Sequence, residues 1–140
     1  MITKKRYERI TSQKKIILDF LKKTKSHPNA KVVWEEVRPK LPQISLATVY
    51  RILDSFKERG DVQELLIEGK SSRYDGNPNF HAHFICTECQ QIFDISGFCQ
   101  ECKILKQKTA KMGKINTYQV TFYGICRGCQ GKRRKNEGNN

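Results

Sequence analysis

Two widely separated cysteine pairs, Cys86-x-x-Cys89 and Cys126-x-x-Cys129, are each placed at a predicted turn beside a strand. Four thiolates at this spacing suit closed tetrahedral coordination, which is typical of a structural Zn(2+) site. Such a site would join the start of a domain to its end. The alternative interpretation is two unrelated thiol pairs.

A third pair, Cys99-x-x-Cys102, lies in residues 99–112, where the pattern predicts a helix. Residues at i and i+3 share a helix face, so these thiols could form a redox pair, exchange into the zinc site, or pack as small apolar side chains. We favour packing. A thiol oxidoreductase is a further alternative, but the pair lacks the strand-then-helix setting that normally activates such thiols.

The only histidines are His27, His81 and His83. His81 and His83 are two residues apart on a predicted strand, so their side chains share one face and could both bind a metal. Asp75 precedes them, Asp94 lies on the next predicted strand, and His27 lies in a break between predicted helices. Imidazole and carboxylate ligands without thiolate suit Fe(2+), Mn(2+) or Zn(2+), with iron or manganese favoured. A lone histidine is more often structural, so spacing leaves this site open.

These residues need elements to position them, and the pattern of the first half predicts three helices. Apolar residues recur at helical spacing in residues 11–24, 30–41 and 46–59. Thr11, Asn29 and Ser45 can cap these helices, Pro42 closes the second, and Gly60 ends the third. Short strands at 62–68 and 71–75 follow, around a Gly69-Lys70 turn. Three helices and a two-stranded wing are the order of a winged helix-turn-helix domain.

The second half predicts strands at residues 81–86, 91–95 and 117–123, besides the helix at 99–112. We therefore expect an α+β fold, with a winged helix-turn-helix domain at 1–76 and a small α/β dimerisation and metal-binding domain at 80–131. Residues 77–79 form the expected linker, and a basic tail at 132–140 is expected to be disordered. A three-stranded sheet leaves an edge open, and a second copy could close it as a homodimer.

The third predicted helix has a polar face opposite its apolar stripe. Small residues on this face permit close approach to a major groove, and an aromatic and a cation can reach base edges or phosphates. The expected DNA-binding residues are Ser45, Ala47, Thr48, Tyr50 and Arg51, together with Lys14 and Lys15 on the first helix. The alternative is an ordinary amphipathic helix with a solvated face.

Charge and hydropathy narrow the class of protein. The chain has 27 lysines and arginines against 14 acidic residues, a net charge of +13. This excess favours a polyanionic partner such as double-stranded DNA, although a solvated surface is the simpler explanation. No apolar run is long enough for a membrane span and no signal peptide is evident, so we expect a cytoplasmic protein without a membrane partner. There, thiols stay reduced and available to metals.

A zinc enzyme is the main alternative class, and the motifs disfavour it. Zinc deaminases need a His-x-Glu element to move protons, whereas this chain has His81-Ala82-His83. Four thiolates would also close the other site to water. We therefore expect a protein that is not an enzyme.

The motifs together resemble the ferric uptake regulator family over nearly the whole chain. They are Leu46-Ala47-Thr48-Val49-Tyr50-Arg51, Ser71-Ser72-Arg73-Tyr74-Asp75, His81-Ala82-His83-Phe84-Ile85-Cys86-Thr87-Glu88-Cys89 and Tyr123-Gly124-Ile125-Cys126-Arg127-Gly128-Cys129. The resemblance implies a DNA-binding winged helix, a C-terminal dimerisation domain, and a structural zinc on the four paired cysteines. It also implies a regulatory metal between the domains, with ligands that match His27, Asp75, His81, His83 and Asp94.

Asp94 favours one branch of that family. Iron sensors commonly have glutamate at this position, whereas peroxide-responsive repressors resemble this chain in having aspartate. In those repressors Fe(2+) reacts with peroxide and a ligand histidine is oxidised, so the resemblance makes His27 and His81 the oxidation-sensitive residues. We expect a peroxide-responsive repressor using Fe(2+) or Mn(2+). The alternative is an Fe(2+)-responsive repressor of iron-uptake genes, because Arg51 looks more like the iron-sensing members.

Overall fold

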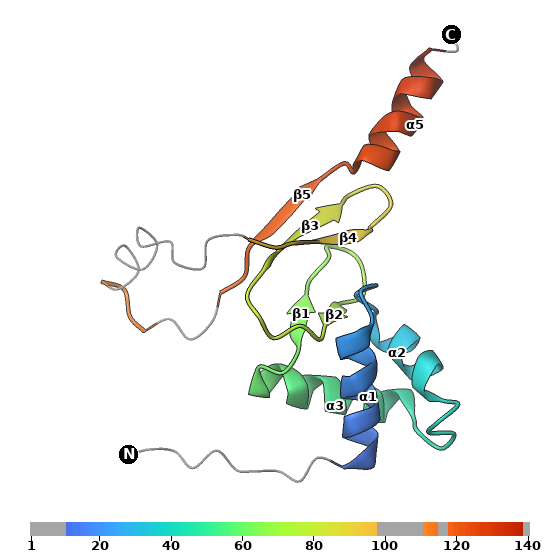
Figure 1. The fold of residues 1–140 in the computed structure, drawn as a ribbon, viewed down its shortest axis with the longest axis vertical. Helices are drawn as coiled ribbons and strands as arrows, with labels where there is room; N and C mark the ends of the chain where they lie inside the picture. Colours follow the sequence, from blue (N-terminus) through green and yellow to red (C-terminus); the bar gives the residue numbers. More distant parts are fainter. Residues whose placement is uncertain (1–10, 98–110, 115–117, 139–140) are drawn as a thin grey trace. The chain divides into compact units, whose positions relative to one another are not determined.

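The computed structural model describes residues 11–97, 111–114 and 118–138 (Figure 1). The chain divides into two compact units, Met1–Pro78 and Asn79–Asn140, and this division falls within the expected linker. Helices and a two-stranded sheet make up the N-terminal unit, and a three-stranded sheet is the centre of the C-terminal unit. The fold is therefore α+β, as the sequence predicts. Within the described residues, no helix is both long and apolar enough to cross a membrane.

The three helices of the N-terminal unit begin at capping side chains. They are α1 (Ser12–Lys23), α2 (Ala30–Val37) and α3 (Leu46–Arg59). Side-chain oxygens of Thr11, Asn29 and Ser45 accept hydrogen bonds from backbone N–H groups of the first turns, which would otherwise lack a partner in the helix. Helix α3 ends at Gly60, whose φ of 76° favours glycine. All three predicted caps are confirmed.

Helix α2 is shorter than the expected 30–41 and ends at Val37. Pro39 has no N–H group, so it cannot continue the helical hydrogen bonds. The following residues form tight turns instead, in which the Leu41 N–H donates to the Val37 carbonyl at 2.9 Å. Leu41 still packs against the hydrophobic core, so the apolar pattern indicated its burial correctly but not its secondary structure.

One hydrophobic core holds the N-terminal unit together. Its buried apolar residues come from all three helices and from the hairpin, and they are Ile17, Leu18, Leu21, Ala30, Val33, Val37, Ile44, Val49, Ile52, Leu53, Phe56, Val62 and Tyr74. The indole N–H of Trp34 donates to the carbonyl of Ile44 at 2.9 Å. Because Ile44 immediately precedes the cap of α3, this bond helps to fix the angle at which α3 leaves the core.

The wing is a hairpin of β1 (Gln63–Leu65) and β2 (Arg73–Asp75), paired antiparallel with Gln63 opposite Asp75. Both strands are shorter than the expected 62–68 and 71–75. The turn near Gly69 is confirmed: Lys70 N–H donates to the Ile67 carbonyl, and Gly69 has a φ of 68°. The chain between the paired strands thus forms a longer loop than two residues.

The C-terminal sheet has the order β4-β3-β5, formed by β3 (Ala82–Cys86), β4 (Ile92–Ile95) and β5 (Thr121–Gly124). Strand β3 pairs antiparallel with β4 and parallel with β5. The register places Phe84 between Phe93 and Phe122, so these rings share one face of the sheet. His83 and Ile85, on the other face, are buried.

For residues 132–137, the structure corrects the expectation of a disordered tail at 132–140. Helix α5 (Arg127–Glu137) follows β5 closely and continues into this segment (Figure 1). Lysine and arginine are good helix formers. The helix is attached to the cysteine cluster through Cys126, at its N-cap position, and through Cys129. The helix expected at 99–112 falls almost wholly on residues 98–110, which lie outside the described residues, as do Cys99 and Cys102.

Candidate metal centres and nucleic-acid interface

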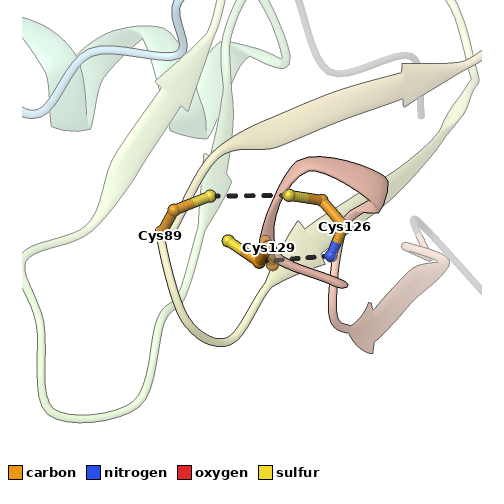
Figure 2. Close-up of side chains that lie close together, drawn as sticks. Cys89, Cys126 and Cys129 are labelled. Carbon is orange, nitrogen blue, oxygen red and sulfur yellow. Dashed lines mark hydrogen bonds between the residues drawn. The ribbon is translucent and has the colours of Figure 1, made fainter. Parts of the chain in front are cut away.

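The sulfur atoms of Cys86, Cys89, Cys126 and Cys129 gather at one end of the C-terminal sheet and all lie within 4.8 Å of one another. Cys89 Sγ is 3.8 Å from Cys126 Sγ (Figure 2). Cys86 Sγ is 3.9 Å from Cys129 Sγ. Four sulfurs about 2.3 Å from a central zinc form a tetrahedron with edges of about 3.8 Å. The cluster therefore has the dimensions of a four-cysteine zinc site.

Two local structures bring these cysteines together. Cys86 ends β3 and Cys89 lies in the turn to β4, where the Gln90 N–H donates to the Cys86 carbonyl and Gln90 takes a φ of 61°. Cys126 occupies the N-cap position of α5, and Cys129 lies in the first turn of the helix. The turn is joined to the end of β5, just before the helix, because the Thr87 N–H donates to the Gly124 carbonyl at 2.8 Å.

The thiols are prepared for metal binding by neighbouring backbone groups. The Cys126 N–H donates to Cys86 Sγ at 3.4 Å, and with the N–H groups of Cys89 and Glu88 it lowers the pKa of Cys86 to about 6. Hydrogen bonding to Cys126, together with burial, raises the pKa of Cys129 instead. Four adjacent thiols without a cation cannot all lose their protons, and a divalent metal would supply the missing positive charge.

A second ligand group in the C-terminal unit comes from His81, His83 and Asp94. Asp94 Oδ1 lies 3.3 Å from His81 Nε2 and 3.4 Å from His83 Nε2. Strand register produces this geometry, because His83 and Asp94 are directly paired and His81 is two residues earlier on the same face. Two ligands about 2.1 Å from one metal are about 3.0–3.4 Å apart in octahedral or tetrahedral geometry. The three side chains thus have suitable spacing for one ion.

The protonation of His81 also fits metal binding. Its Nδ1 lies 2.7 Å from the Asn79 carbonyl oxygen, which only accepts hydrogen bonds. Nδ1 therefore carries the proton, and Nε2 keeps its lone pair for a ligand. A ring nitrogen held in this way is a usual feature of metal-binding histidines.

The N-terminal unit contributes a separate pair, His27 and Asp75. His27 Nε2 lies 3.6 Å from Asp75 Oδ2, and both side chains are buried. The other carboxylate oxygen of Asp75 accepts a hydrogen bond from the Asn77 N–H at 2.9 Å, which orients the carboxylate. Each unit therefore holds part of the predicted histidine and aspartate set in a geometry suited to a metal.

The wing strand β2 supports His27 through Arg73. His27 has a φ of 49°, a left-handed conformation that is rare outside glycine. The Arg73 guanidinium donates hydrogen bonds to the carbonyls of His27 and Ser26, and the Tyr74 N–H donates to the Pro28 carbonyl at 2.9 Å. The sequence pattern did not indicate this role for Arg73, because its partner is 46 residues away.

The predicted DNA-contacting face of α3 is exposed in the structure. Ser45, Ala47, Tyr50 and Arg51 are exposed, and Thr48 is half-buried. Ser45 Oγ lies 2.8 Å from Thr48 Oγ1, and Arg51 Nη2 donates to that same hydroxyl oxygen at 3.2 Å. The face is therefore a connected polar surface that ends in a cation. On α1, Lys15 is exposed and Lys14 is half-buried.

Residues 5–123 match the family model described as the ferric uptake regulator family. The chain belongs to the ferric uptake regulator family: it is a metal-dependent, DNA-binding transcriptional repressor and not an enzyme. This conclusion agrees with the resemblance carried by the sequence motifs.

Within this family, the chain is similar to peroxide-responsive repressors. It is 36% identical to the peroxide-responsive repressor PerR of Staphylococcus epidermidis over 132 residues, which cover 94% of this chain and 84% of that protein. The crystal structure of the Campylobacter jejuni peroxide stress regulator superposes with a TM-score of 0.71 and 31% identity, covering 84% of this chain and 88% of that one. The Helicobacter pylori ferric uptake regulator, at 21% identity, a TM-score of 0.69 and coverages of 87% and 82%, shows the shared fold alone.

Proposed function

We propose that this repressor senses peroxide through oxidation of its own metal ligands. The observation that carries the proposal is the position of Asp94, whose carboxylate lies 3.3 and 3.4 Å from the Nε2 atoms of His81 and His83. An aspartate at this place is the feature that the sequence shares with the peroxide-responsive branch. The 36% identity to a peroxide-responsive repressor supports the same assignment.

The regulatory metal in this proposal is Fe(2+) or Mn(2+), held by His27, Asp75, His81, His83 and Asp94. All five side chains offer nitrogen or carboxylate oxygen, a donor set that suits these ions better than soft metals. The four-cysteine cluster takes Zn(2+) as a structural metal, because its tetrahedron of sulfurs has no opening for a reacting molecule. The two centres therefore have separate tasks, one in stability and one in sensing.

His27 and His81 are the residues we propose to be oxidised. Fe(2+) held by these ligands would promote cleavage of the peroxide O–O bond. Overall, peroxide oxidises the imidazole by two electrons: one of its oxygen atoms is added to a ring carbon, and the other leaves as water. His81 directs Nε2 to the ligand group, since its Nδ1 proton is engaged by the Asn79 carbonyl. An oxidised imidazole binds metal less well, so the ion leaves and the repressor releases its DNA.

The proposed DNA contact places α3 in the major groove of an operator. Ser45, Ala47, Thr48, Tyr50 and Arg51 would face bases and phosphates, and Lys14 and Lys15 would contact the backbone. Ser45 and Ala47 are small and exposed, which permits close approach. Such a repressor acts where the chromosome lies, so the proposal places it in the cytoplasm.

We further propose that the active form is a homodimer that uses the C-terminal sheet. Phe93 and Phe122, which share one face of this sheet, are 38% and 44% exposed. Aromatic surface of this kind is stabilised when another subunit covers it. Light scattering should give twice the chain mass, and Phe122→Asp should shift the protein towards monomer. A monomeric wild-type protein at micromolar concentration would contradict this part of the proposal.

The test of sensing compares two metals in one protein. The chain is loaded with Fe(2+) or Mn(2+), treated with low peroxide, and assayed for operator binding and peptide mass. The iron form should lose DNA affinity and gain one oxygen atom on the peptide of His27 or His81. The manganese form should keep its DNA affinity, and its peptide masses should stay unchanged. Retained affinity in the iron form without an oxygenated histidine would exclude peroxide sensing.

The second candidate function is an Fe(2+)-responsive repressor of iron-uptake genes. Arg51 is the observation that favours it, because this residue on α3 looks more like the iron-sensing members of the family. In that case DNA binding should follow the free Fe(2+) concentration and be restored by fresh iron after peroxide treatment. A peroxide sensor with oxidised histidine should not recover when iron is added.

A further inference from the structure

Helix α5 has a concentration of positive charge that the metal centres do not explain. Of its eleven residues, five are basic and one is acidic. The basic residues are Arg127, Lys132, Arg133, Arg134 and Lys135. None of the helix is buried, so packing on a core does not account for the presence of so many cations.

The cations are unevenly arranged around the helix. With 100° per residue, Arg127, Arg134, Lys135 and Lys132 fall within an arc of about 160°, and Cys129 lies outside it. Arg133, on the same side as Cys129, forms an ion pair with Glu88 in the metal-binding turn. One side of α5 therefore attaches to the cysteine cluster, and the other side presents a face of four exposed cations.

This cationic face is costly for an isolated helix. Lys132 and Lys135 are three residues apart on this face, and like charges at that spacing repel. Eleven residues are also short for a stable helix without tertiary contacts. Attachment at Cys126, Cys129 and Arg133 offsets part of this cost, and a polyanion bound on the free face would offset the rest.

We propose that α5 is a second DNA contact, which binds the phosphate backbone of the duplex without reading its sequence. The occupant is duplex DNA because the chain is a DNA-binding regulator, so the helix is joined to a module that already holds a duplex. Covalent linkage turns the second contact into an intramolecular step. A helix of eleven residues is about 16 Å long. Over that length duplex DNA carries roughly nine to ten phosphate charges.

The proposal goes beyond metal sensing and does not depend on peroxide chemistry. It predicts that part of the DNA affinity resides in α5 and is independent of the operator sequence. It also predicts that loss of the cysteine-bound metal weakens this part, since the anchor of the helix includes Cys126 and Cys129.

The test measures the salt dependence of binding to a mixed-sequence duplex of about 40 bp, roughly four helical turns. The variant Arg134→Gln/Lys135→Gln is compared with Lys111→Gln/Lys114→Gln, a pair of exposed lysines in the same unit with the same loss of charge. Glutamine has a helix propensity close to that of lysine and arginine, so α5 should stay folded. Zinc content and circular dichroism check this.

Each phosphate contact contributes about 0.9 to the slope of log K against log salt concentration. The α5 variant should therefore lower the slope by up to about 1.8, and the control variant should leave it close to wild type. Equal changes in both variants would show an effect of net charge only and overturn the proposal, as would an unchanged slope in the α5 variant. If peroxide sensing fails its own test, this slope difference is still expected.

Discussion

Arg73 and His27 are joined by a hydrogen bond from the guanidinium of the wing strand to the backbone carbonyl of the histidine. The same guanidinium donates to the Ser26 carbonyl at 2.7 Å, and Asp75, two residues further along β2, lies 3.6 Å from the His27 ring. One strand therefore supplies both a carboxylate for the proposed metal site and the support of its histidine. It also connects the site to the wing.

Replacing Arg73 with glutamine should weaken regulatory metal binding more than it weakens the fold. Without the guanidinium, His27 loses the support for its left-handed backbone, and loss of such an outer partner typically lowers metal affinity about 10- to 100-fold. Titration with Mn(2+) measures the affinity, and thermal unfolding of the metal-free protein measures stability. Arg59→Gln is the matched control, since Arg59 forms an ion pair with nearby Asp61 at 3.1 Å and lies away from the His27 backbone in the sequence. An equal loss of affinity in both variants would contradict the positioning role.

Removing one ligand of the cysteine cluster should cost the structural metal and much of the stability of the C-terminal unit. Cys86→Ser leaves three thiolates. It also removes the sulfur atom that accepts a hydrogen bond from the Cys126 N–H. Metal binding to small zinc domains contributes on the order of 10 kcal/mol to folding. Metal analysis should therefore show loss of about one zinc per chain, with a lower Tm. Cys99→Ser is the matched control and should keep its zinc, so equal zinc loss in both variants would argue against the four-cysteine assignment.

Gly76→Ala should destabilise the N-terminal unit, because no space exists for a side chain. A Cβ atom at this position would lie 2.5 Å from the Leu21 backbone carbon and 2.6 Å from its oxygen. Overpacking of this kind costs about 1–3 kcal/mol. Urea unfolding measures the change, and Mn(2+) affinity should fall with it, because Gly76 adjoins Asp75. Gly131→Ala on α5 is the control, because a Cβ atom there would meet no other atom within 4 Å. This variant should unfold at the same urea concentration as wild type or at a slightly higher one.

The ion pair between Lys57 on α3 and Glu64 on β1 should make stability depend on pH. Their Nζ–Oε2 distance is 2.7 Å, and the contact lowers the pKa of Glu64 below 4.5 and raises that of Lys57 above 10.5. The lowered pKa of Glu64 contributes stability above 4.5, which is lost as pH falls through the folded-state pKa. The raised pKa of Lys57 contributes stability below 10.5, which is lost as pH rises through its folded-state value.

Glu64→Gln isolates this effect. The variant should be less stable than wild type by up to about 1 kcal/mol at neutral pH, since Lys57 is partly exposed and the pair is screened. The difference should disappear in acid, once Glu64 is protonated in both the folded and unfolded states. Denaturant unfolding across pH checks this, and a difference that persists below the pKa of Glu64 would point to lost packing instead.

Local patterns in the sequence determined the elements, the caps and the ligand types of this protein. Helical periodicity and short capping residues predict α1 and α3 because a helix start is decided by a few neighbouring side chains. The spacing of Cys86, Cys89, Cys126 and Cys129 predicts their cluster because two short turns place each pair. The family resemblance added the assignment of His27 and Asp75, which spacing left open.

Tertiary structure decided what depends on contacts between distant segments. Strand register brings Asp94 opposite His83, and the sequence alone placed the two only on neighbouring strands. The support of His27 by Arg73 and the close approach of Gly76 to α1 arise from packing, which leaves no periodic signal. Helix α5 forms where charge alone suggested a disordered tail, because its first turn belongs to the cysteine cluster. Local propensity depends on residues that are neighbours in the sequence, whereas these contacts exist only after distant segments pack together.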